Sequence, residues 1–152
     1  ENVIGIDIDN SKLDAAREMG ASKTLNSKSA NAVAELQKYA ESRLMAVIDT
    51  FGGESTGQLA VRALAKSGQY LLVGQAGGDF KMPQVWLPQK AMMVRGSHVG
   101  NSPQLRKLID MVRAGKVKLM PIERRQLSGI NQAVEDLEQG RVTGRIVFIT
   151  DH

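Results

Sequence analysis

The strongest constraint on the fold is a regular alternation of short apolar segments with segments of helical periodicity. The apolar segments cover residues 3–8, 23–26, 44–49, 69–73, 92–99, 121–125 and 144–150. Strands without polar alternation are buried on both faces, and a helix between consecutive strands allows them to run parallel. The sequence therefore predicts a single α/β domain with a doubly wound parallel sheet that carries helices on both faces.

Start and stop signals delimit the helices between these strands. Gly20 and Gly115 each follow a helical segment, where a left-handed residue commonly ends a helix. The expected N-terminal caps are Asn10 or Ser11, Ser29, Ser102 followed by Pro103, and Ser128. The side chains expected to face the core from the last two helices are Leu105, Leu108, Ile109 and Val112, and Ile130, Ala133, Val134 and Leu137. Two prolines limit any long element within residues 79–91.

The composition excludes several classes of protein. The 152 residues contain no cysteine and two histidines, His98 and His152, so we expect no disulfide and no metal site within this chain. The net charge of +4 comes from scattered basic residues, and aromatic residues make up only 4%, which argues against a nucleic-acid partner. No apolar run approaches the roughly 20 residues that cross a bilayer. We therefore expect a cytoplasmic protein without a membrane partner.

The first apolar segment ends in an acidic residue, Asp7, which is the strongest candidate for a binding residue. Ligands of open parallel sheets bind at the carboxyl ends of the strands, where a carboxylate can accept bonds from both hydroxyls of an adenosine ribose. The same charge repels a 2′-phosphate and so favours NAD over NADP. The position also fits S-adenosylmethionine, and Asp7 or Asp9 could instead cap the helix that follows.

Other candidates are weaker by themselves. Lys12 lies in the first turn of the following helix, where it could reach a ribose hydroxyl or a phosphate, or could be solvated. The strands that end near residues 49 and 73 are both followed by glycines, which allow a backbone to approach a ligand closely. Glycines repeated at the same end of successive strands favour a binding crevice over plain turns.

One expected motif is missing. A Rossmann-type dinucleotide-binding domain begins with a strand, a G-x-G-x-x-G turn and a helix, and no such turn occurs in these 152 residues. We therefore interpret the chain as a truncated domain, residues 1–152, that starts at the second strand. Because the first strand is normally central, its neighbours would have unpaired edges. We expect the isolated chain to associate through that edge or to rearrange its sheet.

These motifs resemble the cofactor domain of medium-chain zinc-dependent alcohol dehydrogenases, and most closely the archaeal type. The resemblance runs in order through nearly the whole chain. It rests on IGIDIDNSKL at 4–13, REMGA at 17–21, AVIDTFGG at 46–53, ALAKSGQYLLVG at 63–74, RGSHVGN at 95–101, AGKVK at 114–118 and GRVTGRIV at 140–147.

The resemblance implies the roles of particular residues. NAD would be held at the adenosine ribose by Asp7, Ile8 and Lys12, with Phe51 near the adenosine end of the crevice. The other cofactor-binding positions that it implies are Val73, Gly74 and Gln75 beside the nicotinamide, Ser97 and Val99 at its amide, and Arg145 at the pyrophosphate. It also implies a homo-oligomer joined through residues 92–99, an alcohol or aldehyde substrate, and a zinc site in a separate catalytic domain.

The departures from the family shape the functional prediction. Neither the phosphate-binding turn nor a set of zinc ligands is present, and no convincing nucleophile or acid–base pair is visible. We predict that the 152-residue chain has no dehydrogenase activity alone and binds NAD weakly or not at all. The alternatives are a zinc-free quinone oxidoreductase of the same superfamily, a methyltransferase-like domain, and a non-catalytic assembly or adenosine-cofactor-binding module.

Overall fold

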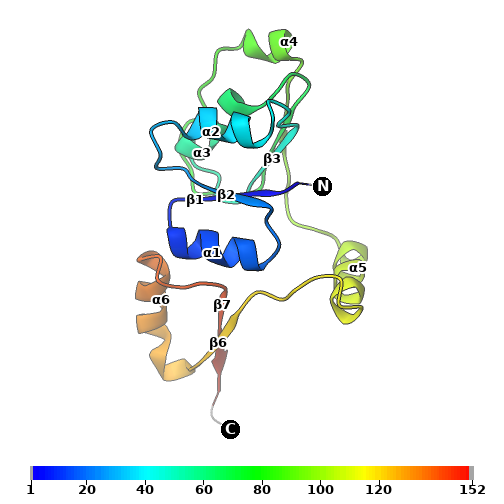
Figure 1. Ribbon diagram of the computed structural model, residues 1–152. Coiled ribbons are helices and arrows are strands. Elements are labelled where there is room, and N and C mark those ends of the chain that lie inside the picture. The colour runs from blue at the N-terminus through cyan, green and yellow to red at the C-terminus, as the bar shows by residue number, and fades with distance from the viewer. Residues whose placement is uncertain (1, 151–152) are drawn as a thin grey trace.

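The computed structural model describes residues 2–150 and has an α/β architecture (Figure 1). The described strands are β1 (Ile4–Asp7), β2 (Lys23–Asn26), β3 (Ala46–Asp49), β4 (Gln69–Leu72), β5 (Met93–Gly96), β6 (Ile122–Gln126) and β7 (Arg145–Ile149). The helices are α1 (Asn10–Glu18), α2 (Ala32–Tyr39), α3 (Glu54–Ala63), α4 (Trp86–Lys90), α5 (Ser102–Arg113), the 3-10 turn η1 (Leu127–Gly129) and α6 (Ile130–Glu138). Every apolar segment predicted to be a strand is confirmed as one.

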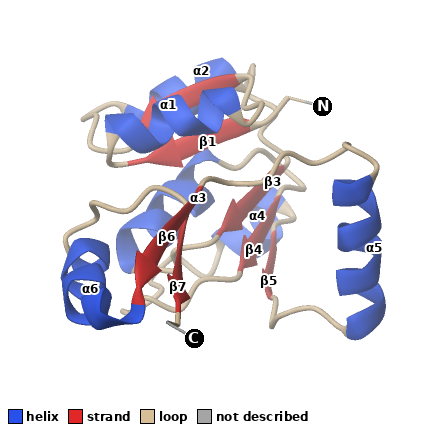
Figure 2. Cartoon of the chain, turned by 90° about the horizontal axis from the view of Figure 1, so that it is seen from below, coloured by secondary structure: helices blue, strands red, loops and turns tan. Residues whose placement is uncertain are grey.

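The strands pair in parallel but do not form one continuous sheet. β1 pairs with β2, β3–β4–β5 form a three-stranded sheet, and β6 pairs with β7 (Figure 2). The predicted α/β class with parallel strands is therefore confirmed. Within residues 2–150 no ladder joins β1 to β3. The first strand of a doubly wound sheet would lie between these two strands.

The β1–β2 pair is packed between helices. Leu13 of α1 is 4% exposed, and Gly5 approaches this helix so closely that an added Cβ would lie 3.1 Å from the Ala16 Cβ. On the other face, a core cluster joins Leu25 of β2 to Leu36 of α2 and Ala63 of α3. A small residue at the strand and an apolar helix face thus determine how closely α1 and α2 approach this pair.

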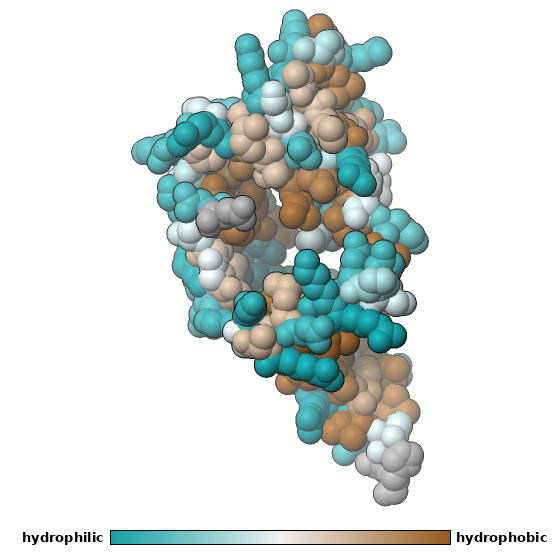
Figure 3. Space-filling view, turned by 90° about the vertical axis from the view of Figure 1, so that its right-hand side faces the viewer, coloured by the Kyte–Doolittle hydropathy of each residue, from teal (hydrophilic) through white to brown (hydrophobic). Residues whose placement is uncertain are grey.

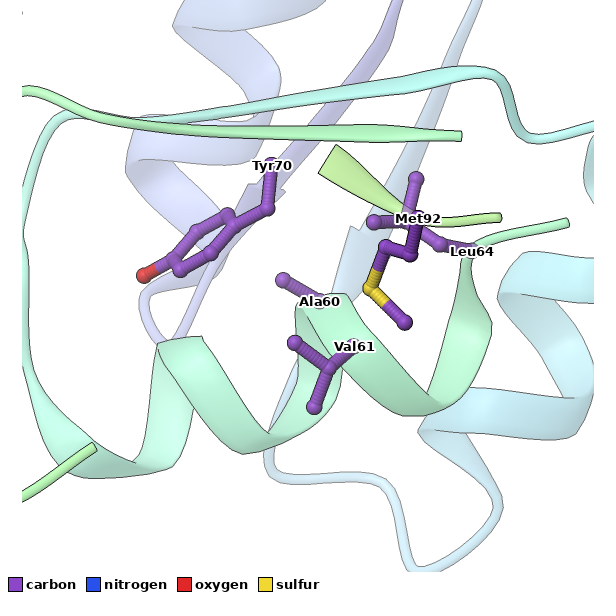
Figure 4. Close-up of a cluster of buried hydrophobic side chains, with 5 residues drawn as sticks. All are labelled: Ala60, Val61, Leu64, Tyr70 and Met92. Atoms are coloured by element: carbon purple, nitrogen blue, oxygen red, sulfur yellow. The ribbon is translucent and has the colours of Figure 1, made fainter. Parts of the chain in front are cut away.

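A second core lies beneath the β3–β4–β5 sheet (Figure 4). Its buried members are Ala60, Val61, Leu64, Tyr70 and Met92. These side chains come from α3 and the residue after it, from β4 and from the residue before β5, so this core holds α3 against one face of the sheet. The Lys90 ammonium donates to the Val61 carbonyl at 3.0 Å and the Leu64 carbonyl at 3.3 Å, and so stabilises the carboxyl end of α3.

The prediction of helices on both faces is wrong for the three-stranded sheet. Ile48 is 67% exposed and Met93 51% exposed, so the face opposite α3 is open. The core-facing roles predicted for α5 and α6 are also wrong, apart from Ala133. Leu105, Leu108, Ile109, Ile130, Val134 and Leu137 are exposed, and Val112 is only half-buried. In Figure 3 a gap passes through the molecule, with apolar side chains above it and hydrophilic side chains along its lower edge.

Three predictions about caps and short helices need correction. The alternative that Asp9 caps α1 is confirmed, because its carboxylate accepts from the Ser11 amide at 2.8 Å, and the caps Asn10 and Ser11 are wrong. Asn101, and not Ser102, caps α5, and its side chain and that of Gln104 bond reciprocally to each other's backbone amides. The short helix α4 within residues 79–91 has no counterpart among the predicted elements.

The other two serines predicted as caps also have different positions. α2 begins at Ala32, and the Ser29 hydroxyl instead donates to the Glu35 carboxylate at 2.6 Å. Ser128 lies within η1, the turn that leads into α6.

Candidate functional site

The candidate site lies at the carboxyl ends of β1, β3, β4 and β5, where parallel strands of this class present their ligands. Asp7 is the last residue of β1, as predicted. Its Oδ1 accepts from the Ile8 amide at 2.7 Å and from the Asp9 amide at 3.0 Å. Since both bonds go to Oδ1, Oδ2 is the oxygen that these bonds leave for a ligand. Ile8 is 58% exposed beside it.

Asp49, at the end of β3, organises the next turn. Its Oδ1 accepts from the Phe51 amide at 3.0 Å and the Gly52 amide at 2.8 Å, and its carbonyl accepts from the amides of Val73 and Gly74 after β4. Burial by itself would raise the pKa of the Asp49 carboxyl. Bonds from Thr56, Gly52, Tyr70 and Phe51 outweigh burial, so its pKa lies below the ordinary value. The carboxylate is therefore charged although only 6% of the residue is exposed.

Glycines allow the turns after β3 and β4 to touch. Gly52 has φ +74°, and a Cβ placed on it would lie 2.1 Å from the Gly74 carbonyl oxygen. A Cβ on Gly74 would lie 2.1 Å from the Phe51 carbonyl carbon. Because real Cβ atoms do not approach backbone so closely, both positions require glycine. Phe51 is 61% exposed, and its ring lies against Gly53, where an added Cβ would be 2.5 Å from the Phe51 Cε1 atom.

The remaining predicted residues occupy two regions. Val73, Gly74 and Gln75 follow β4 directly, and Ser97 and Val99 follow β5. The Ser97 amide donates to the Leu72 carbonyl at 2.8 Å, which aligns the end of β5 with the end of β4. These residues thus share the strand ends with the turn that carries Phe51.

Lys12 and Arg145 lie nearer the β6–β7 part of the chain. Lys12 is in the first turn of α1, with its ammonium 3.8 Å from where a Cβ of Gly140 would stand. Arg145 begins β7, pairs with Ile122 and donates to the Gly144 carbonyl at 3.5 Å. These contacts of Arg145 therefore lie within the β6–β7 pair.

Sequence reasoning missed Tyr70, whose hydroxyl donates to Asp49 Oδ2 at 2.9 Å. The signal in the sequence is a tyrosine in the middle of an apolar strand, since a buried phenol requires a hydrogen-bond partner. The partner lies 21 residues away in the sequence, and strand pairing brings the two together.

The described residues do not fit a zinc site. Within residues 2–150 no group of three or more His, Cys, Asp or Glu side chains is placed to hold a metal ion. The residue types that most often bind zinc are also scarce, since the sequence has no cysteine and two histidines. Of its two histidines, His98 follows β5, and His152 lies outside the described residues. No helix within the described range is long and apolar enough to cross a membrane.

Comparison with known proteins shows the family of the chain. Residues 2–114 match the family described as zinc-binding dehydrogenase. The chain is 32% identical over 148 residues to an NAD-dependent alcohol dehydrogenase of Sulfurisphaera tokodaii; the match covers 97% of this chain and 43% of that relative. The chain thus spans less than half the length of the curated relative.

Solved structures of other proteins share the fold of this chain. An alcohol dehydrogenase from the archaeon Aeropyrum pernix superposes with a TM-score of 0.90 at 28% identity, over 97% of this chain and 42% of that one. A quinone oxidoreductase of Pseudomonas syringae superposes with a TM-score of 0.80 at 21% identity, over 97% of this chain and 49% of that one. The second likeness shows the fold alone.

Proposed function

The chain belongs to the zinc-binding dehydrogenase family, and we propose from this that it forms most of the NAD-binding domain of an alcohol dehydrogenase. In that enzyme it would take part in hydride transfer between an alcohol or aldehyde and NAD. The chain contributes cofactor binding, and the segments that it does not span would contribute the phosphate-binding turn and the zinc site.

The observation that carries the proposal is Asp7 at the carboxyl end of β1. A carboxylate oxygen there can accept bonds from both ribose hydroxyls, and a bond to a charged acceptor contributes about 1.5–3 kcal/mol. The Ile8 and Asp9 amides hold Oδ1, which fixes the orientation of the carboxylate before a ligand arrives. The close contact between Gly52 and Gly74 also supports the proposal, because glycines without side chains at the strand ends allow a ligand to approach the backbone.

Each group of residues then has a defined task. Asp7 and Ile8 receive the adenosine ribose, with Lys12 on the same side, and Phe51 lies toward the adenosine. Val73, Gly74 and Gln75, with Ser97 and Val99, line the nicotinamide side, and Arg145 serves the pyrophosphate. When bound, NAD supplies the carbon that accepts the hydride. The residues of this chain hold and orient it, and we propose that the chain alone is inactive.

We also propose that this alcohol dehydrogenase is a homo-oligomer joined along β5. Met93 and Val94 on this strand are 51% and 39% exposed, and β5 is an edge strand within the described sheet. Exposed edges of this kind are natural sites of strand-to-strand association.

The proposed cofactor site is tested by titrating the 15N-labelled chain with millimolar NAD while its amide chemical shifts are recorded. We expect shifts at residues 7–9, 51–53 and 73–75, a smaller response to NADP, and loss of the ribose-side shifts in Asp7→Asn. Asp14→Asn is the matched control, because Asp14 is an exposed acid on α1 that forms an ion pair with Arg17. We propose that the chain keeps weak binding of NAD, so unchanged shifts in the wild-type chain, or equal responses in both variants, would contradict the proposal.

A further inference from the structure

We propose that Tyr70 is a positioning residue for the cofactor-facing turn at residues 50–53. Its hydroxyl holds the Asp49 carboxylate, and the carboxylate in turn holds the amides of Phe51 and Gly52. The purpose of this arrangement rests on the proposed function, whereas its geometry does not.

The two side chains are buried and hydrogen-bonded to each other. Tyr70 is 2% exposed and Asp49 is 6% exposed, and their side chains meet at 2.9 Å. Burial, followed by the bond to Asp49, raises the pKa of the Tyr70 phenol well above its ordinary value, so the phenol remains a donor. The tyrosine occupies Oδ2, and this leaves Oδ1 directed at the turn.

The hydroxyl is itself held in place from two sides. The Phe80 ring lies 5.6 Å from the Tyr70 ring, centroid to centroid. A Cβ added at Gly57 would lie 3.0 Å from the Phe80 ring and 3.3 Å from the Tyr70 hydroxyl oxygen. α3 therefore passes directly over the phenol at a glycine, and the ring has little room to turn the hydroxyl away from Asp49.

The backbone amides of the turn at residues 50–53 are held by Asp49, and its backbone carbonyls are held by another loop. The Phe51 and Gly52 carbonyls accept from the Ala76 and Gly77 amides at 3.0 and 3.2 Å, so the carbonyl side is joined to the loop after β4. The Phe51 and Gly52 amides both donate to Asp49 Oδ1. If the carboxylate rotates, these two amides lose the acceptor that the structure shows for them, and Phe51 loses its fixed position at the crevice.

Ordinary core packing is the competing explanation for a buried tyrosine. Packing involves the ring, whereas positioning involves the hydroxyl, so Tyr70→Phe separates the two roles. Amide hydrogen exchange, followed by NMR, measures each site. We expect Tyr70→Phe to speed exchange of the Phe51 and Gly52 amides about tenfold, as for loss of one buried hydrogen bond, with no comparable change in α2. Tyr39→Phe, at a cation–π contact with Lys23, should leave both amides unchanged.

The outcomes separate the inference from the proposed function. Unaltered exchange at Phe51 and Gly52 in Tyr70→Phe would overturn the positioning role, and so would an equal acceleration throughout the chain, which indicates packing alone. Should Tyr70→Phe fold poorly, Asp49→Asn weakens the same acceptor and should speed the same two amides. A wild-type chain without any NAD-dependent shifts would count against the proposed cofactor site and leave the exchange result to stand by itself.

Discussion

Among single residues, two glycines at the candidate site cannot be replaced without moving the backbone that lies against them. The turns after β3 and β4 touch at Gly52 and Gly74, and the space between them is too small for a Cβ on either residue. Gly96, at the end of the neighbouring strand β5, would have no atom within 4 Å of an added Cβ and so provides a contrast within the same sheet.

We expect Gly74→Ala to lower the free energy of unfolding by about 3 kcal/mol, because the methyl group would overlap the Phe51 backbone and force the two turns apart. Gly96→Ala should change it by less than about 0.5 kcal/mol. Urea unfolding followed by circular dichroism measures both. Equal midpoints for the two variants would show that the turns can separate without cost.

The residues also show what sequence reasoning can reach. Asp7 is predictable at a strand end because a local run of β-branched residues marks the strand. The Tyr70–Asp49 bond is not, because it depends on the register of β3 against β4. Asp9 and not Asn10 caps α1, because Asp9 has the extended backbone of an N-cap (φ −113°, ψ 122°) and Asn10 is already the first helical residue.

Among the helices and strands, one ion-pair network joins β6 to α6. The Asp136 carboxylate accepts from Arg125 at 2.6 Å, from Arg141 at 2.6 Å and from Gln132 at 3.1 Å. Bonds from Arg141, then Arg125 and then Gln132, lower the pKa of Asp136 from 3.8 to about 2. The network thus ties the strand, the helix and the loop that leads to β7.

The depressed pKa predicts how the stability of this unit depends on pH. A carboxyl whose pKa is lower in the folded state stabilises the fold above its unfolded pKa, and the contribution is lost as the pH falls through the folded value. We therefore expect the urea midpoint to fall between about pH 4 and about pH 2 and to fall less steeply in Asp136→Asn. Asp14→Asn, at an exposed pair, should retain the wild-type slope. The same slope in Asp136→Asn and wild type would contradict the role of the network.

The elements are more predictable than their packing. Each strand has a local signal in its apolar residues, and each is confirmed. The apolar stripe of α5 is also visible in the sequence, but Leu105 and Leu108 are exposed. Periodicity shows that a helix has an apolar face. It does not show which surface, if any, packs against this face.

In the molecule as a whole, the main departure from a continuous sheet is the break between β1 and β3. Both strands present an unpaired edge within residues 2–150, and unpaired edges favour association. The missing glycine-rich turn predicts this break from the sequence. The same reasoning could not predict that the face of the β3–β4–β5 sheet opposite α3 would be open.

We expect the isolated chain to show a light-scattering mass above its monomer mass of 16.5 kDa, through the free edge of β3. Ile48→Lys places a charge on that edge strand and should lower the mass toward the monomer. Val94→Lys, on β5, should remove only the separate β5 contact proposed for the homo-oligomer and leave the association through β3 in place. A monodisperse wild-type monomer would refute association, and dispersal by Val94→Lys alone would assign it to the β5 edge instead.

The two cores share one helix, and this has a consequence for the response to heat. The cluster around Leu36 lies against β2 and the cluster around Tyr70 lies against β4, and no backbone ladder joins the two sheets within the described residues. α3 nevertheless contributes Ala63 to the first cluster and Ala60 and Val61 to the second, so loss of this helix disrupts both cores together. We therefore expect the calorimetric and van't Hoff enthalpies to agree for these two ladders. A larger calorimetric enthalpy would show that they melt as separate cooperative blocks.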